Sequence, residues 1–388
     1  ISAILDQQAK LNQTEQQLAS GKRVLNPSDD PVAAVQILDI TEDLKLVDQY
    51  SRNGDLAEGQ LALEESTLAE VGNILQRVRE LVVQANNASQ TPETRNSIAT
   101  EIEARLDELE ALGNTRDGNG EYIFAGFQSA VEPFSRQANN FSYNGDDGQR
   151  FLQLGSSSQV SVRDSGFDVF MSIPSGNGTF DVEPDASNAG TGVVGATAVD
   201  GSFITDDYTL SFIQATPSDP ITYQVMDSTP AVIAGGTYES GDTISFAGAS
   251  LKFDGLPADG DSFDVTPSVK QDMFTSIQMI ANDLKNSGAL PAETAAVNNG
   301  MAQALNNLDQ ALGHVLEVRS DVGVRLSQVD NQRSINDSFT LQLEDTLSDI
   351  QDVDYAEAIS RLNLQLTALQ AAQQTYVKVQ GLSLFNYL

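Results

Sequence analysis

The sequence contains no cysteine, no tryptophan and a single histidine, His314, among its 388 residues. Disulfide bonds, thiolate zinc sites and cysteine nucleophiles are therefore excluded from this chain. Histidine-based catalysis is limited to His314, which Ser320 and Asp321 follow closely. Catalytic triads are recognised by spatial geometry and not by proximity along the chain, so a histidine on the flank of a helix is the favoured interpretation.

Positive charge is also scarce, because 21 lysines and arginines face 55 aspartates and glutamates, for a net charge of −34. The negative electrostatic field of such a chain repels phosphate backbones and anionic lipid headgroups. We therefore expect no nucleic acid and no membrane among the partners. Alternatively, the acidity only keeps a crowded or secreted protein soluble. No run approaches the roughly 20 apolar residues that a transmembrane helix needs. The chain begins at Ile1 without a methionine, so we expect its N-terminal helix to be truncated at the start.

Helix-breaking residues divide the chain into three parts. Most of the 29 glycines lie between Gly113 and Gly260, and prolines are absent from 32–91 and from 292–388. This distribution indicates two helical flanks around a middle of a different character.

The first flank carries a helical period. Apolar or small residues recur at intervals of three and four from Val47 to Ala85, interrupted only by Glu64. This narrow stripe needs another helix against it. Asp30 before Pro31 predicts the N-cap and first position of that long helix, and a shorter helix follows Pro92.

The second flank repeats the pattern. A helix over 273–284 is followed by an apolar register that begins at Met301. Arg333, Asn336 and Thr340 interrupt this register, which indicates a solvated joint, a contact to another subunit, or a tolerated surface stretch. The spacing slips to five between Ile350 and Tyr355, so we expect one rod with two segments that face different neighbours.

Both terminal segments have an apolar face. Because isolated helices are marginal in water, we expect these faces to pair with each other and with neighbouring copies. The candidate assembly residues are Ile4, Leu11, Leu18 and Leu25, spaced by seven, and Ile359, Leu362, Leu366, Leu369 and Tyr376.

Short alternating runs in the middle, such as 208–212 and 221–225, predict strands between Gly, Asn, Asp and Pro turns. We interpret 180–201 as a loop or a weak strand pair. The predicted fold is therefore α+β, with long coiled-coil-like helices from both termini bracketing an inserted β-rich domain. The expected divisions are 1–26 (N-terminal assembly helix), 27–117 (helical rod), 118–267 (β-rich outer domain), 268–350 (helical rod) and 351–388 (C-terminal assembly helix).

The search for chemistry yields no catalytic, cofactor or metal site. Asp117, Asn119 and Glu121 have the alternate-oxygen spacing of a calcium loop, but Tyr122 and Gln128 stand where an EF-hand needs glycine and glutamate. A glycine-rich turn is the better interpretation. We predict a protein that is not an enzyme and that has no cofactor.

Two pairs of motifs, at opposite ends of the chain, resemble one family. The segments 18–23 (LASGKR) and 26–31 (NPSDDP) resemble the N-terminal signature of bacterial flagellins and their hook-associated relatives. The segments 319–323 (RSDVG) and 348–356 (SDIQDVDYA) resemble the C-terminal signature. Within this family, 115–127 (TRDGNGEYIFAGF) and the ending 382–388 (LSLFNYL) are more similar to the hook-associated branch than to flagellin.

The resemblance implies a structural flagellar subunit that joins the hook region to the filament. It further implies type III export without a cleaved signal peptide, an extracellular location, and terminal helices that form an inner tube. The implied partners are the first hook-associated protein, flagellin, copies of the chain in a ring, and an export chaperone on the C-terminal helix. The alternatives are flagellin itself or, from another class, a secreted adhesin.

Overall fold

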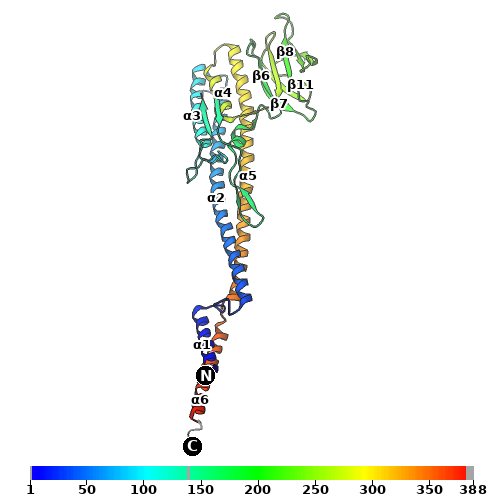
Figure 1. Cartoon of the computed structure of the whole chain (residues 1–388). Coiled ribbons are helices and arrows are strands. Elements are labelled where there is room, and N and C mark those ends of the chain that lie inside the picture. Colours follow the sequence, from blue (N-terminus) through cyan, green and yellow to red (C-terminus); the bar gives the residue numbers. More distant parts are fainter. Residues whose placement is uncertain (1, 138–139, 382–388) are drawn as a thin grey trace. The chain divides into compact units, whose positions relative to one another are not determined.

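The computed structural model, which describes residues 2–137 and 140–381, has long helices at both ends and strands between them (Figure 1). This arrangement confirms the predicted α+β class. None of the helices in the described residues has an apolar stretch long enough to cross a membrane. The helices are α1 (Ser2–Ser20), α2 (Pro31–Ala85), α3 (Pro92–Gly113), α4 (Met273–Lys285), α5 (Pro291–Gln351) and α6 (Tyr355–Gly381), with one π-helical turn η1 (Phe167–Met171).

The strands form several antiparallel sheets. Three two-stranded pairs are β1 (Phe134–Gln137) with β2 (Asn140–Tyr143), β3 (Phe151–Gln153) with β4 (Gln159–Ser161), and β5 (Ile173–Pro174) with β14 (Lys270–Gln271). A five-stranded sheet has the order β10-β9-β8-β13-β6, and a three-stranded sheet the order β11-β12-β7. The strands of these two sheets are β6 (Phe180–Pro184), β7 (Val193–Val199), β8 (Tyr208–Ile213), β9 (Thr222–Met226), β10 (Val232–Thr237), β11 (Thr243–Phe246), β12 (Ala249–Asp254) and β13 (Ser262–Pro267).

The chain divides into two compact units. The first comprises 1–55, 153–159 and 329–388, and the second comprises 56–152 and 160–328. Helices α2 and α5 contribute to both units.

Helix α2 begins at Pro31 as the sequence predicts, because the Asp30 carboxylate accepts a hydrogen bond from the backbone N–H of Ala33 at 3.1 Å. In the second unit, the ion pairs Arg79–Asp309 and Arg319–Glu65, both 2.6 Å, connect α2 to α5. The predicted apolar stripe of α2 is buried there, at Ala57, Leu61, Leu68, Val71, Leu75, Val78, Val82 and Ala85.

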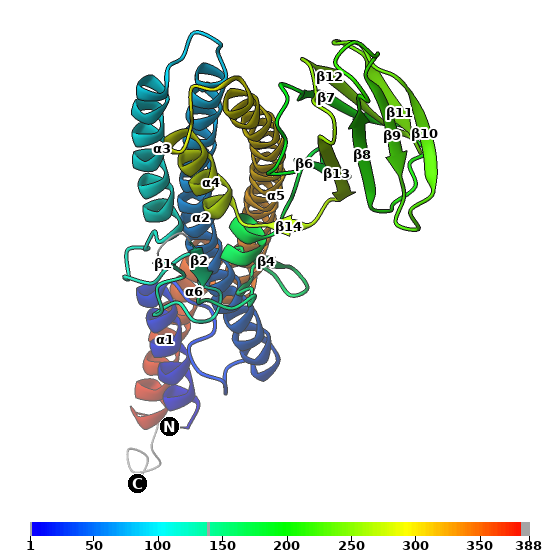
Figure 2. The same ribbon diagram turned by 90° about the horizontal axis from the view of Figure 1, so that it is seen from above.

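Helices α3 and α4 lie side by side in the second unit (Figure 2). Lys285 of α4 pairs with Glu103 of α3 at 2.6 Å. The ring of Phe274 on α4 lies 4.9 Å from that of Phe134 on β1 and 5.5 Å from that of Phe170 on η1, measured between centroids. The strands and the π turn between 134 and 171 therefore share an aromatic core with the helices.

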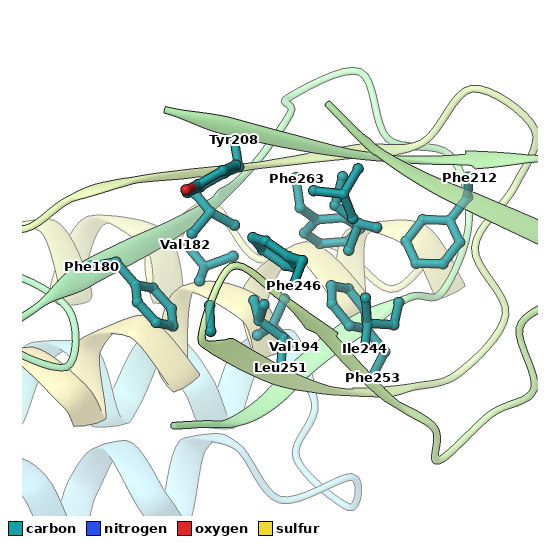
Figure 3. Close-up of a cluster of buried hydrophobic side chains, with 14 of the residues drawn as sticks. Phe180, Val182, Val194, Tyr208, Phe212, Ile244, Phe246, Leu251, Phe253 and Phe263 are labelled. Carbon is teal, nitrogen blue, oxygen red and sulfur yellow. The ribbon is translucent and has the colours of Figure 1, made fainter. Parts of the chain in front are cut away.

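The two larger sheets enclose a separate core (Figure 3). Phe253 from the three-stranded sheet contacts Phe212 and Phe263 from the five-stranded sheet, with ring centroids 5.4 and 4.9 Å apart. The interpretation of 180–201 as a loop or weak strand pair was wrong. Strands β6 and β7 do not pair with each other but join β13 and β12, because partners distant in sequence supply their hydrogen bonds.

The sheet core, residues 176–267, is inserted at one narrow point. The hydroxyl of Ser268 donates to the carbonyl oxygen of Ser175 at 2.8 Å, so the chain enters and leaves side by side. Amide side chains on α5 hold the inserted strands. Asn307 accepts from the N–H of Gly176 at 2.7 Å, and Asn299 donates to the carbonyl of Gly192 at 3.0 Å.

The slip in spacing between Ile350 and Tyr355 coincides with a break, since α5 ends at Gln351 and α6 begins at Tyr355, and the two segments are separate helices and not parts of one rod. The polar residues that interrupt the apolar register of α5 make contacts within the first unit. Asn336 donates to the carbonyl oxygen of Leu154 at 2.9 Å, and Arg333 forms an ion pair with Asp55.

Candidate functional site

Helix α1 presents a mixed polar and apolar buried face. Leu11, Thr14 and Gln17 are buried, and they recur at intervals of three, so they share one side of the helix. The hydroxyl of Thr14 donates to the carbonyl of Lys10 at 3.0 Å, and the amide of Gln17 donates to the carbonyl of Arg23 at 2.6 Å. These bonds satisfy the polar groups, which makes their burial tolerable.

Helices α1 and α6 lie side by side (Figure 1). Gln7 of α1 donates to the backbone carbonyl of Gln365 at 3.4 Å, and Ala358 of α6 is fully buried. The expectation that the terminal helices pair with each other is confirmed. Of the candidate residues, Leu11 is buried, and six are half-buried: Ile4, Leu18, Leu25, Leu362, Leu369 and Tyr376. Leu25 lies beyond the end of α1.

Two candidate residues of α6 remain open. Ile359 is 49% exposed and Leu366 39% exposed, and Val377 on the same helix is 67% exposed. They are spaced by seven and eleven residues, close to two and three whole turns, so they lie on one side of α6. We call these three residues the outer stripe. The sequence had placed Ile359, Leu362, Leu366 and Leu369 in one seam, whereas a single partner helix covers only part of it.

The segments next to α1 and α6 form a joint that the sequence analysis did not foresee. The N–H of Arg23 donates to the carbonyl of Gln351 at 2.7 Å, and that of Val353 to the carbonyl of Gly21 at 2.9 Å. The guanidinium of Arg23 also donates to the carbonyl of Ile350 at 2.8 Å. Gly21 has a φ of +72°, a conformation that favours glycine. The joint thus binds the two linkers together.

Arg23 also forms an ion pair with Asp30 at 3.2 Å. The hydrogen bond from the Ala33 N–H, helped by Arg23, lowers the pKa of the Asp30 carboxyl below its ordinary value. The same carboxylate therefore caps α2 and holds the arginine of the joint. In the sequence, the joint is marked only by the motif that contains Gly21, Arg23 and Asp30. The structure shows the different contact that each of these residues makes.

The residues considered for catalysis and metal binding have other contacts. The Nε2 atom of His314 lies 2.7 Å from the carbonyl oxygen of Asp168. The Asp117 carboxylate accepts from the N–H groups of Asn119 and Glu121 at 2.8 and 3.0 Å, as expected of a turn. Over the described ranges, 2–137 and 140–381, no group of three or more His, Asp or Glu side chains is placed to hold a metal ion. The motif at 382–388 lies outside the described residues.

Comparison with known proteins relates both helical flanks to one family. The model of the bacterial flagellin N-terminal helical region matches residues 2–129, and that of the C-terminal helical region matches residues 305–388. Flagellar hook-associated protein 3 of Escherichia coli (strain K12) is 28% identical over 383 residues, which cover 99% of this chain and 94% of that protein.

Solved structures show the same relationship. The crystal structure of the flagellar junction protein FlgL from Legionella pneumophila is 33% identical with a TM-score of 0.75, covering 82% of this chain and 100% of that one. By contrast, Escherichia coli flagellin is 32% identical over 118 residues, which amount to 30% of this chain and 24% of that flagellin. The alignment thus extends along nearly the whole chain for the hook-associated protein but only over 118 residues for that flagellin.

Proposed function

The chain belongs to the bacterial flagellin family, and we propose that it is the structural subunit that joins the flagellar hook region to the flagellin filament. The observation that carries the proposal is the pairing of α1 with α6, which leaves the outer stripe of α6 uncovered. An apolar stripe on a helix pair is suited to burial against further helices. The extent of the similarity favours this function over that of the filament subunit.

The partners that suit this function are neighbouring copies in a ring, the first hook-associated protein on one side and flagellin on the other. A head-to-tail contact around a ring repeats in every subunit, so the same outer stripe forms the same contact in each copy. We further propose that an export chaperone covers α6 before assembly, because Ile359, Leu366 and Val377 would otherwise face water. The export is of the type III kind, the location is extracellular, and the role is structural and not enzymatic.

The test uses a motile strain whose own junction protein is deleted. Expression of this chain, with the first hook-associated protein and flagellin of its own source, should restore filaments and swimming. The purified chain alone should not form long filaments. Polymerisation of the chain by itself into filaments, or filament growth without it in the matched system, would contradict the proposal.

A further inference from the structure

One carboxyl group lies inside the rod formed by the second unit. Glu64 occupies the polar position of the α2 stripe and is 1% exposed. Its Oε1 atom accepts a hydrogen bond from the backbone N–H of Asp164 at 3.0 Å. Its Oε2 atom is buried and has no hydrogen-bond partner among the described residues. A buried carboxylate oxygen without a partner is costly, whereas a protonated carboxyl reduces that cost.

The surrounding charges form ion pairs with one another, although Nη1 of Arg325 and Nε of Arg163 are buried without a hydrogen-bond partner among the described residues. From α5, Arg325 forms an ion pair with Asp164, and Asp321 also lies near Arg325. From the segment before η1, Arg163 pairs with Asp117 at 2.6 Å and with Glu121 at 3.3 Å.

Glu121 in turn holds Arg150 at 3.0 Å. The three cations Arg150, Arg163 and Arg325 thus meet four anions, Asp117, Glu121, Asp164 and Asp321. An ionised Glu64 would add to the excess of negative charge in this cluster, and a proton on Glu64 avoids that addition.

Burial, followed by the neighbouring Asp164 carboxylate, raises the pKa of Glu64 from 4.5 to about 8. The backbone hydrogen bond from Asp164 and the charges of Arg325 and Arg163 act in the opposite direction but are smaller. This agrees with the geometry, because both arginines form their ion pairs with other carboxylates and neither donates a hydrogen bond to Glu64.

We propose that Glu64 is a proton-operated latch that fastens the segment 163–164 between α2 and α5. In its protonated form it accepts the Asp164 N–H without adding charge to the cluster. Its ionisation places an uncompensated carboxylate beside Asp164, so the segment detaches and the contact between the two long helices loosens. The ligand of this site is a proton, and the response is a local opening of the rod at alkaline pH.

The direction of the pH effect follows from the affinity of Glu64 for its proton in the closed and in the open latch. The carboxyl binds its proton more tightly when the latch is closed than when it is exposed to water. The stabilisation is therefore complete below pH ~4.5 and declines as the pH rises through about 8. If opening exposes Glu64 fully, the opening equilibrium grows by close to tenfold per pH unit, or about 25-fold from pH 5.5 to 7.0.

The experiment measures hydrogen-exchange protection of segment 160–166 in the full chain between pH 5.5 and 8.5. Protection factors correct for the intrinsic pH dependence of exchange. In the wild type, the protection factors of this segment should fall as the pH rises, by the factor derived above for the opening equilibrium. In Glu64→Gln, whose side chain stays neutral, the protection factors should stay nearly constant. Glu65→Gln is the matched control, because it removes a neighbouring carboxylate that is partly exposed and paired with Arg319. This control should follow the wild type.

A second measurement reads the proton directly and does not need the variant to fold. Infrared spectra of wild-type protein with ¹³C-labelled glutamate should contain a protonated-carboxyl carbonyl band at pH 7 that disappears as the pH is raised. If Glu64→Gln folds, its spectrum should lack that band. The proposal is overturned if no such band titrates in the wild type, or if Glu64→Gln loses protection in parallel with it.

Discussion

The outer stripe of α6 allows assembly to be separated from folding with one double substitution. Ile359→Asp with Leu366→Asp places two carboxylates on a side that is open in the single chain. Leu362 and Leu369 are poorer choices, because they are half-buried within the helix pair and their replacement would also disturb α1. We expect the Ile359/Leu366 variant to fold and to be exported normally but to fail in assembly.

The expected magnitude follows from the area still exposed. Full burial of an isoleucine or leucine is worth roughly 1.5–3 kcal/mol. Since Ile359 keeps 49% and Leu366 39% of its surface exposed, complete coverage adds about 1 kcal/mol for each. The substitution removes this gain and buries two unpaired carboxylates, at several kcal/mol. A loss of about 5 kcal/mol per contact weakens association by more than ~1,000-fold.

The assay combines electron micrographs of cells with blots for flagellin in the medium. Cells that carry only the variant should lack filaments and release flagellin, while circular dichroism of the purified variant should match the wild type. The matched control is Ala368→Asp with Thr375→Asp, since both residues are exposed. Each lies nine residues, or about two and a half turns, from Ile359 or Leu366. Normal filaments on the Ile359/Leu366 variant, or equal failure of the control, would refute the reasoning.

Two further substitutions and one deletion address other parts of the chain. Arg23→Ala removes hydrogen bonds of a charged group to the carbonyl of Ile350, so docking of the terminal helices should weaken by about 1.5–3 kcal/mol. Limited proteolysis should then cleave α1 and α6 sooner, with the rest of the chain unchanged. Phe253→Ala should destabilise the sheet core by about 3–5 kcal/mol, and hydrogen exchange should show that the helices stay protected. Replacing 176–267 by a short Gly-Ser linker between Ser175 and Ser268 should preserve ring formation, and failure of a folded, exported deletion variant would place an essential contact in the sheets.

Local signals in the sequence predicted the helices well. Asp30 and Pro31 fix the start of α2 because the cap and the first helical position are set by neighbouring residues. The slip in spacing after Ile350 marked the place where α5 ends, but local signals did not show that the helix breaks there. The helix ends at Gln351, where the carbonyl groups of Ile350 and Gln351 accept hydrogen bonds from Arg23 and the N–H of Val353 donates to Gly21, more than 300 positions earlier. The apolar spacing alone indicated two segments of one rod and not a break between two helices.

The candidate site was predicted as a set of positions but not as a geometry. A period of three and four identifies a face, yet it does not say how much of that face one partner covers. Leu362 and Ile359 were therefore grouped together, although one is half-buried and the other is open. Thr14 and Gln17 were missed because polar residues in a buried face carry no hydrophobic signal, and their burial depends on hydrogen bonds seen only in the fold.

The pairing of α1 with α6 has a consequence for the order in which the chain folds. The contact from Gln7 to Gln365 spans 358 positions, so closing that loop directly carries a large entropic cost. Hairpins such as β11–β12 close within a few residues and form early. Once α2 and α5 are in place, the joint at Arg23 and Gln351 brings the two ends together and the remaining closure is short. We therefore expect the terminal pair to form last, which delays assembly competence until the body of the subunit has folded.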